Sequence, residues 1–150
     1  MEKYKLFTQT LYSFGNIDYS VLLNDCTGVE YMVLSKIDEC INKSGAGYTN
    51  VTILSDELHV SLPAVSRALK RLEEKKYIER NVDIFCRRNT RVKLTKTGKI
   101  ELAKCQSNLD DFFTELFNDM DVSEQNTMLE SVQKMYKKIH ENLQKHKGDF

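Results

Sequence analysis

The sequence of 150 residues predicts a mainly α-helical chain that contains one small β-hairpin. Apolar residues recur every three or four positions over most of its length, which is the spacing of amphipathic helices. Two short runs with β character, YIERNV and TRVKLT, flank the segment DIFCRRN, and this pattern indicates a hairpin with a long basic tip. Two short helical patterns, separated by only three residues, precede the hairpin. A chain of this length is the size of one ordinary domain.

The N-terminal third is predicted to be helical. A first helix extends from about residue 4 to the Phe14–Gly15 region, and its apolar positions are Leu6, Phe7, Leu11 and Phe14. After a break, a second helix carries the apolar positions Val29, Val33, Ile37, Cys40 and Ile41. The segment KSGAGYTN, residues 43–50, contains two glycines among small polar residues and is predicted to be a loop.

A short helix is predicted after this loop, followed by a tight turn at residues 59–61. Thr52 occupies the expected N-cap position of the short helix. One face of the helix carries Leu54, Ser55 and Leu58.

The helix after the turn is predicted to begin at Ser61, which caps it. Pro63, the only proline, lies in the first turn, where its missing N–H group costs nothing. The inward stripe consists of Val65, Leu69 and Leu72. The outward positions are Arg67, Lys70, Arg71 and Glu74.

Two further helices follow the hairpin. The first begins near Thr97–Gly98 and carries the apolar residues Leu102, Cys105, Leu109, Phe112, Phe113, Leu116 and Phe117. Ser123 is the expected cap of the second, whose stripe is Met128, Leu129, Val132, Met135, Tyr136, Ile139 and Leu143. The segment 109–117 holds five bulky apolar residues, more than a helix that faces solvent on one side needs.

Composition predicts a cytoplasmic globular protein. No apolar run approaches the ~18–20 residues of a membrane span, and the N-terminus lacks the features of a signal peptide. The four cysteines, at positions 26, 40, 86 and 105, have no C-x-x-C or zinc-finger spacing. They are therefore expected to be free thiols, and we expect neither a metal nor another cofactor. Without a nucleophile motif, a glycine-rich phosphate loop or a carboxylate pair, an enzyme is not expected.

The charge is distributed unevenly although the net charge is zero. Residues 51–99 contain twelve basic and six acidic residues, whereas the rest of the chain contains ten basic and sixteen acidic residues. All six arginines lie between Arg67 and Arg91. Because the arginine fork pairs bidentately with phosphate or guanine, the middle of the chain is expected to bind an anionic partner.

Two short helices around a tight turn, followed by a basic hairpin, form a winged helix-turn-helix arrangement. The second helix fits the major groove of duplex DNA, with its N-terminal residues against the base edges. The wing reaches the backbone or the minor groove. The residues predicted to contact double-stranded DNA are Ser61, Pro63, Ala64, Ser66, Arg67, Lys70, Arg87, Arg88 and Asn89.

The segment VTILSDELHVSLPAVSRALKRLEEKKYIER, followed by CRRNTRVKLTKTG, resembles the MarR family of bacterial transcriptional regulators. The resemblance rests on a serine-capped recognition helix, an R-L-E run at residues 71–73, the Tyr77–Arg80 run and an L-T-x-x-G exit at residues 94–98. It covers about 50 residues locally, and the order of helices agrees over the whole chain. One departure is Cys86, where the family carries an aspartate before the paired wing arginines.

The resemblance implies a homodimeric, sequence-specific DNA-binding protein, most simply a repressor. Residues 49–97 would form the DNA-binding part, and residues 1–48 and 98–150 the helical dimerisation part. Two recognition helices about 34 Å apart imply a pseudo-palindromic operator. The family also implies release by a small, often phenolic or amphipathic, ligand bound between the two parts. No membrane partner is expected.

Two alternatives stay open at this point. A winged helix also serves as an adaptor that contacts another protein, in which case duplex DNA would not bind. Cys86 lies beside two arginines, which lower the pKa of a thiol and favour its reactive form, so a thiol-responsive regulator is the second alternative. Cys40 and Cys105 lie on apolar stripes and are more simply small core residues.

Overall fold

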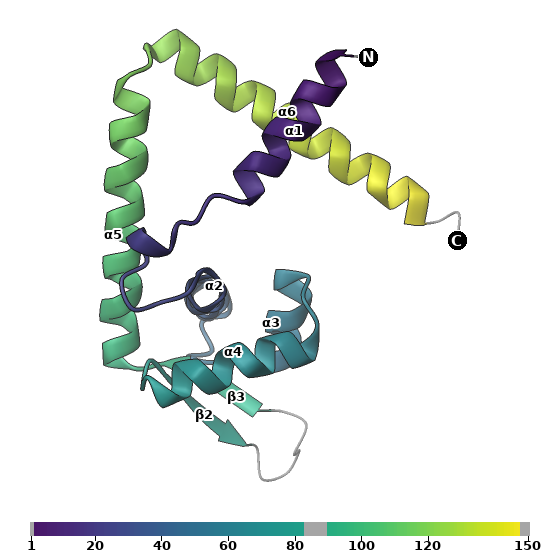
Figure 1. Cartoon of the computed structure of the whole chain (residues 1–150). Helices are drawn as coiled ribbons and strands as arrows, with labels where there is room; N and C mark the ends of the chain where they lie inside the picture. The colour runs from purple at the N-terminus through teal and green to yellow at the C-terminus, as the bar shows by residue number, and fades with distance from the viewer. Residues whose placement is uncertain (1, 83–89, 148–150) are drawn as a thin grey trace. The chain divides into compact units, whose positions relative to one another are not determined.

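The computed structural model describes residues 2–82 and 90–147, and it confirms a mainly helical chain with a small sheet (Figure 1). The chain divides into two compact units, residues 1–109 and 110–150. The elements are α1 (Glu2–Gly15), the 3-10 helix η1 (Ser20–Leu22), α2 (Gly28–Ser44), β1 (Thr49–Asn50), α3 (Val51–Leu58), α4 (Leu62–Glu74), β2 (Ile78–Val82), β3 (Thr90–Leu94), α5 (Lys96–Asn118) and α6 (Val122–Lys147). Of the helices described, none combines the length and the apolar character that crossing a membrane requires.

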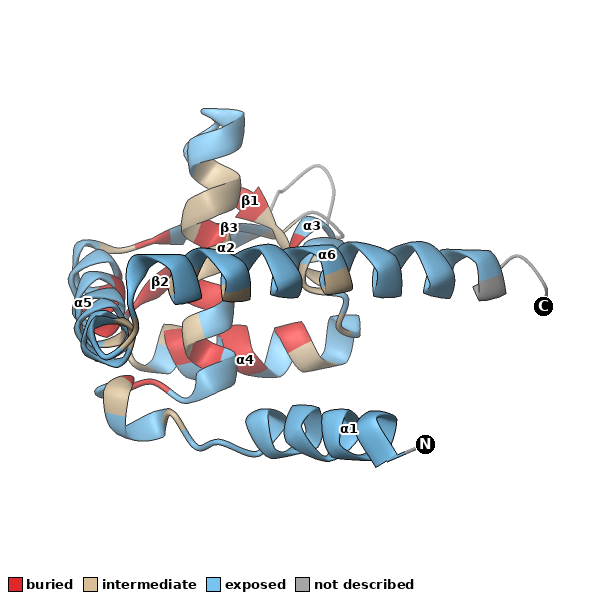
Figure 2. Ribbon diagram, turned by 90° about the horizontal axis from the view of Figure 1, so that it is seen from above, coloured by how far each residue is buried: buried red, intermediate tan, exposed pale blue. Residues whose placement is uncertain are grey.

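The core of the first unit surrounds α2. This helix packs against α3, α4 and β3, and its apolar stripe of Val33, Leu34 and Ile37 is fully enclosed. Among the described residues, every buried apolar side chain lies between Leu23 and Cys105. In Figure 2, red segments occur in α2, α4 and α5, whereas α1 and α6 carry none. Burying one large aliphatic side chain contributes about 1.5–3 kcal/mol, so this stripe anchors the helices around it.

The sheet has three antiparallel strands in the order β1–β3–β2. β2 and β3 form the predicted hairpin, with Ile78 opposite Leu94 and Val82 opposite Thr90. β1 adds Thr49 opposite Val92 on the other edge of β3. The prediction of a continuous loop over residues 43–50 was therefore wrong at both ends, since α2 extends to Ser44 and Thr49–Asn50 is a strand. A two-residue strand has no alternation to detect and forms only because β3 pairs with it.

Two predicted helix caps were wrong by two residues. The side chain of Asn50, not Thr52, caps α3 by accepting a hydrogen bond from the Ile53 N–H (2.9 Å). Asn50 ends β1 in an extended conformation, which leaves its amide oxygen free to cap. At α6, Asp121 accepts hydrogen bonds from the N–H groups of Ser123 and Glu124 (2.8 and 2.9 Å). The Asp121 N–H donates to Glu124 in return, so a reciprocal capping box starts the helix before Ser123.

The helices near the two ends carry exposed apolar side chains. None of the described residues of α1 is buried, and its predicted stripe of Leu6, Phe7, Leu11 and Phe14 faces solvent. In the second unit, the exposed apolar residues include Phe112, Phe113, Leu116, Leu129, Val132, Tyr136, Ile139 and Leu143. The helical periodicity predicted for these segments is confirmed, but the single chain does not bury their apolar faces.

Candidate nucleic-acid interface

The predicted helix-turn-helix is present as α3, a three-residue turn and α4. His59 ends α3 in a left-handed conformation, with φ 53° and ψ 37°. The Ser55 hydroxyl donates a hydrogen bond to the carbonyl oxygen of Val60 (2.7 Å), and the Val60 N–H donates to the Ser55 carbonyl oxygen (3.2 Å). These two bonds fix the direction in which the chain enters α4.

The inner face of α4 holds the helix on the core. Val65, Leu69 and Leu72 are buried as predicted, together with Ala68. Pro63 lies in the first turn. Ser61 occupies the N-cap position, but only its carbonyl oxygen caps the helix, accepting from the N–H groups of Ala64 and Val65 (2.9 and 3.1 Å). Its hydroxyl makes no capping bond and lies exposed at the start of the helix.

The outer face of α4 gathers the predicted contact residues. Pro63, Ser66, Arg67 and Lys70 are spaced three, four and seven positions apart, which places them on one side of a helix, and all four are exposed. Ala64 lies at the border and is half-buried. Within the described part of the chain, no hydrogen bond or ion pair engages the Arg67 or Lys70 side chain. These two cations are therefore available to an external anion.

Arg71 is exposed, as predicted and as Arg67 is, but unlike Arg67 it has partners within the chain. Its Nε atom donates to Oε1 of Glu30 (2.9 Å), and Lys75 lies 3.1 Å from Oε2 of the same carboxylate. Glu30 is only 1% exposed and also forms a capping box with Thr27 at the start of α2. Arg71 thus fastens α4 to α2.

The charge state of Glu30 is fixed by these contacts. Burial favours the neutral carboxyl, but hydrogen bonds from the Thr27 N–H, Lys75 and Arg71 outweigh it and hold the pKa of Glu30 below its ordinary value. Sequence reasoning did not single out Glu30 or Lys75. The T-x-x-E spacing at residues 27–30 is a local capping signal that could have identified Glu30. Nothing in the local sequence predicts that Lys75 contacts Glu30.

The described basic residues of the sheet also have partners. Arg80 Nε donates to Glu73 at the end of α4 (2.8 Å). The guanidinium of Arg91 lies 4.5 Å from the centre of the Tyr48 ring, a cation–π contact. The described arginines between residues 67 and 91 therefore include three side chains with partners, Arg71, Arg80 and Arg91. Arg67 has no hydrogen-bond or ion-pair partner among the described residues.

The tip of the wing lies outside the described residues. The structure gives no placement for residues 83–89, which include Cys86, Arg87, Arg88 and Asn89. Their predicted contacts with DNA, and the predicted reactivity of Cys86, stay predictions. β2 and β3 define where this segment leaves and re-enters the sheet.

The contacts of Thr95 and Gly98, just after β3, account for the L-T-x-x-G pattern at residues 94–98. The Thr95 hydroxyl donates to the Lys76 carbonyl oxygen (2.7 Å) and accepts from the Gly98 N–H (2.9 Å). A Cβ atom on Gly98 would lie 1.9 Å from the carbonyl oxygen of Tyr77. Only glycine permits this approach, which brings the start of α5 against the segment that joins α4 to β2.

Comparisons with known proteins agree with this geometry. The family model described as winged helix-turn-helix DNA-binding matches residues 45–79, which span β1, α3, the turn and α4. No curated protein matches the sequence at a significant level.

Solved structures match over most of the chain. FabT of Streptococcus pneumoniae in complex with DNA has a TM-score of 0.72 at 24% identity, covering 92% of this chain and 98% of that one. An S. aureus MepR variant has a TM-score of 0.69 at 21% identity, covering 93% and 98%. An E. coli MarR variant complexed with operator DNA has a TM-score of 0.65 at 28% identity, covering 85% and 91%. The predicted fold class and the predicted family resemblance are both confirmed.

Proposed function

We propose that this chain, a MarR-like winged helix-turn-helix protein, binds double-stranded DNA sequence-specifically as a homodimer and represses transcription. The observation that carries the proposal is the outer face of α4, where Arg67 and Lys70 are exposed and have no partner among the described residues. Arginine and lysine at such positions release counterions from DNA and supply most of the affinity. FabT and a MarR variant, which share the fold, have been solved with DNA.

The start of α4 would supply sequence preference. Ser61, Ser66 and the half-buried Ala64 present small side chains, which allow the helix to approach base edges closely in the major groove. The inner face of α4 is held by core packing and by the Arg71–Glu30 contact. These contacts hold α4 in place before DNA binds, which reduces the entropic cost of binding.

The exposed apolar helices support the homodimer. In this proposal residues 49–97 form the DNA-binding part, while residues 1–48 and 98–150 carry the dimerisation part; α2 and the start of α5 also contribute to the core of the first unit. A two-fold dimer places two recognition helices about 34 Å apart, so the operator is pseudo-palindromic. A small amphipathic ligand that changes this separation would release the protein from DNA.

Fluorescence anisotropy with a duplex from the region upstream of this protein's own gene tests the proposal. Titrations at two salt concentrations compare the wild type with Arg67→Ala/Lys70→Ala and with Arg87→Ala/Arg88→Ala. Each lost phosphate contact lowers the slope of log affinity against log salt by about one. The matched control, Lys134→Ala/Lys138→Ala, removes two positive charges from α6 and leaves the slope unchanged.

Absence of binding at low salt, to this or any other duplex, would contradict the proposal and favour a protein-contact adaptor. Equal losses in the α4 variant and the α6 control would show that net charge, not the face of α4, determines binding.

A further inference from the structure

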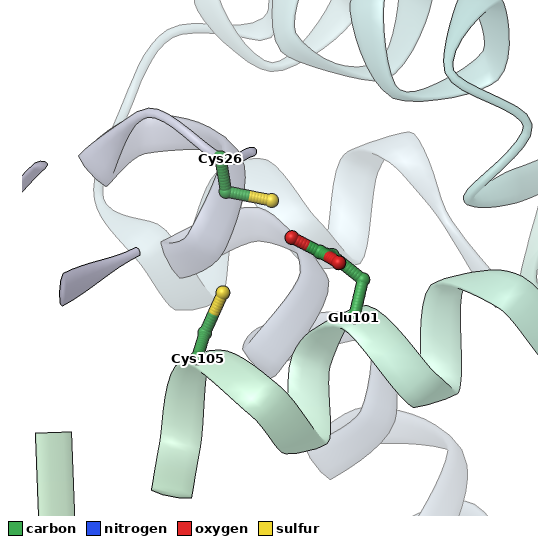
Figure 3. A group of neighbouring side chains, drawn as sticks. All are labelled: Cys26, Glu101 and Cys105. Atoms are coloured by element: carbon green, nitrogen blue, oxygen red, sulfur yellow. The ribbon is translucent and has the colours of Figure 1, made fainter. Parts of the chain in front are cut away.

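Cys26, Glu101 and Cys105 meet in the interior of the first unit. Cys26 lies just before α2, whereas Glu101 and Cys105 are one turn apart on α5. Their two sulfur atoms and a carboxylate oxygen all lie within 4.8 Å of one another, and all three residues are buried. Figure 3 shows the three side chains pointing toward a common point between the two segments.

This donor set has the chemistry of a zinc site. Zn²⁺ takes Cys sulfur at about 2.3 Å and carboxylate oxygen at about 2.0–2.2 Å in a tetrahedral arrangement. Donor atoms bound to one such ion are then about 3.5–3.8 Å apart, so donor atoms that lie within 4.8 Å of one another would move together by up to about 1 Å. The three residues supply three ligands and leave the fourth position of the tetrahedron open. Mg²⁺ and Ca²⁺ require oxygen ligands and do not fit two sulfurs.

Glu101 is a buried carboxylate that is held by hydrogen bonds. The carboxylate accepts hydrogen bonds from the Asn24 side-chain amide (2.9 and 3.1 Å) and from the Asp25 N–H (3.1 Å). Within the described part of the chain, no ion pair engages it, although Glu101 is only 5% exposed. A buried carboxylate is costly unless a cation or a metal balances it. Its hydrogen bonds hold it in place, as the outer contacts of metal ligands do.

Asn24 adopts a left-handed conformation with φ 52°. This conformation is uncommon for a residue other than glycine. It turns the chain so that the Asn24 side chain and the next N–H group both reach Glu101. The backbone before α2 thus positions two hydrogen-bond donors on the Glu101 carboxylate.

The two thiols are poorly placed to act as a redox switch that forms and breaks a disulfide. Cys26 is only 4% exposed and Cys105 is fully buried. Attack on an oxidant or on another disulfide requires access to the sulfur, and both sulfurs are enclosed. A metal ion, which displaces the protons on binding, fits this enclosed position better than a redox switch.

We propose that Cys26, Glu101 and Cys105 bind one Zn²⁺ ion that joins the segment before α2 to α5. The site connects to the recognition helix through Asp25. The Asp25 carboxylate accepts from the Tyr77 hydroxyl (2.9 Å), and its backbone carbonyl accepts from Lys75, which shares Glu30 with Arg71 of α4. Zinc then stabilises the position of α4, so DNA affinity rises with occupancy; this second step rests on the proposed function.

Cobalt titration of the reduced, chelator-treated full-length protein tests the site without reference to DNA. We expect one Co²⁺ per chain with thiolate-to-cobalt charge-transfer absorption, displacement by Zn²⁺ and no competition from Mg²⁺. Cys26→Ser and Cys105→Ser should each weaken binding at least about 10-fold. Cys40→Ser and Cys86→Ser are the matched controls and should bind as the wild type does. Loss of the thiolate absorption in either control, or its absence in the wild type, would overturn the assignment.

X-ray absorption of the zinc-loaded wild type keeps the proposal testable if a cysteine variant does not fold. Two sulfur neighbours at about 2.3 Å from zinc are expected, and a shell without sulfur would overturn the site. Anisotropy with duplex DNA, with zinc or with chelator, then tests the coupling. Equal affinities would overturn the coupling alone, whereas a protein that binds zinc but no duplex would contradict only the proposed function.

Discussion

The helix α4 and the helices near the two ends of the chain have the same helical periodicity of apolar residues. The apolar face is buried in α4 and exposed in the helices near the ends. In α4, the apolar stripe of Val65, Leu69 and Leu72 is buried against the core. In α6, Leu129, Val132 and Ile139 repeat at similar spacing and stay exposed. Periodicity alone therefore states which side of a helix is apolar, but not what covers it.

The difference indicates where a second chain would contribute. Exposed apolar patches of this extent mark interaction surfaces in proteins that are not embedded in membranes. The exposed stripes described above lie on α1 and in residues 110–150, while the apolar stripe of α4 is buried within one chain.

Charges on the apolar face of α1 should convert a dimer into monomers. Leu6→Asp/Leu11→Asp places two carboxylates where the proposed interface is dry, and an unpaired buried charge is strongly unfavourable. Light scattering coupled to size exclusion measures the mass. Ile53→Asp, which changes an apolar residue of α3 that is 44% exposed, should leave the dimer intact. A wild-type protein that elutes with the mass of one chain would contradict the proposed homodimer.

A truncation inside the core should lower the free energy of unfolding by several kcal/mol. Leu69→Ala removes a fully buried side chain, and such changes cost about 2–5 kcal/mol. Leu62→Ala on the same helix is the control, because Leu62 is 48% exposed and its loss should cost less than about 1 kcal/mol. Urea unfolding of both variants checks this, and equal losses would show that α4 is not held by its inner face.

Removal of the Glu30 charge should lower stability by about 1–3 kcal/mol, as expected for hydrogen bonds to a charged group. Because the pKa of Glu30 is lowered in the folded protein, its contribution is complete above the unfolded value and fades as the pH falls toward the folded one. Urea unfolding of Glu30→Gln and wild type at pH 7 and near pH 3 should therefore show a smaller difference in acid. Glu57→Gln, at an exposed position, is the control, and a pH-independent difference would contradict this account.

The smallest effect is expected from the turn before α4. Ser55→Ala removes the bond to the Val60 carbonyl oxygen and should cost about 1 kcal/mol. Thr10→Ala in α1 removes a similar hydroxyl-to-carbonyl bond, to Leu6, but that bond lies within an exposed helix and its loss should cost nothing. Thermal unfolding of the two variants compares them, and a Thr10→Ala loss as large as that of Ser55→Ala would refute the distinction.

Much of the fold was predictable because its signals are local. The stripe of α4 and Pro63 in its first turn depend on residues a few positions apart, and the β-hairpin joins two strands that are neighbours in the sequence. The signal for the cap of α6 was also local, because Asp121 and Glu124 form the D-x-x-E pattern of a capping box. The prediction placed the cap at Ser123 instead, because serine is a common N-cap residue. The contact residues on α4 followed from the same spacing, and their role in DNA binding stays a prediction.

By itself, the sequence determined which residues form helices, where the hairpin lies, and that the arginines concentrate in the middle of the chain. Only the tertiary structure decided that Arg71 pairs with Glu30 while Arg67 has no partner among the described residues, and that Thr49–Asn50 pairs with β3. It also decided that Cys26 lies beside Cys105. These features depend on residues far apart in the chain, and the partner of a charge or a thiol is whichever group the folded core brings within reach.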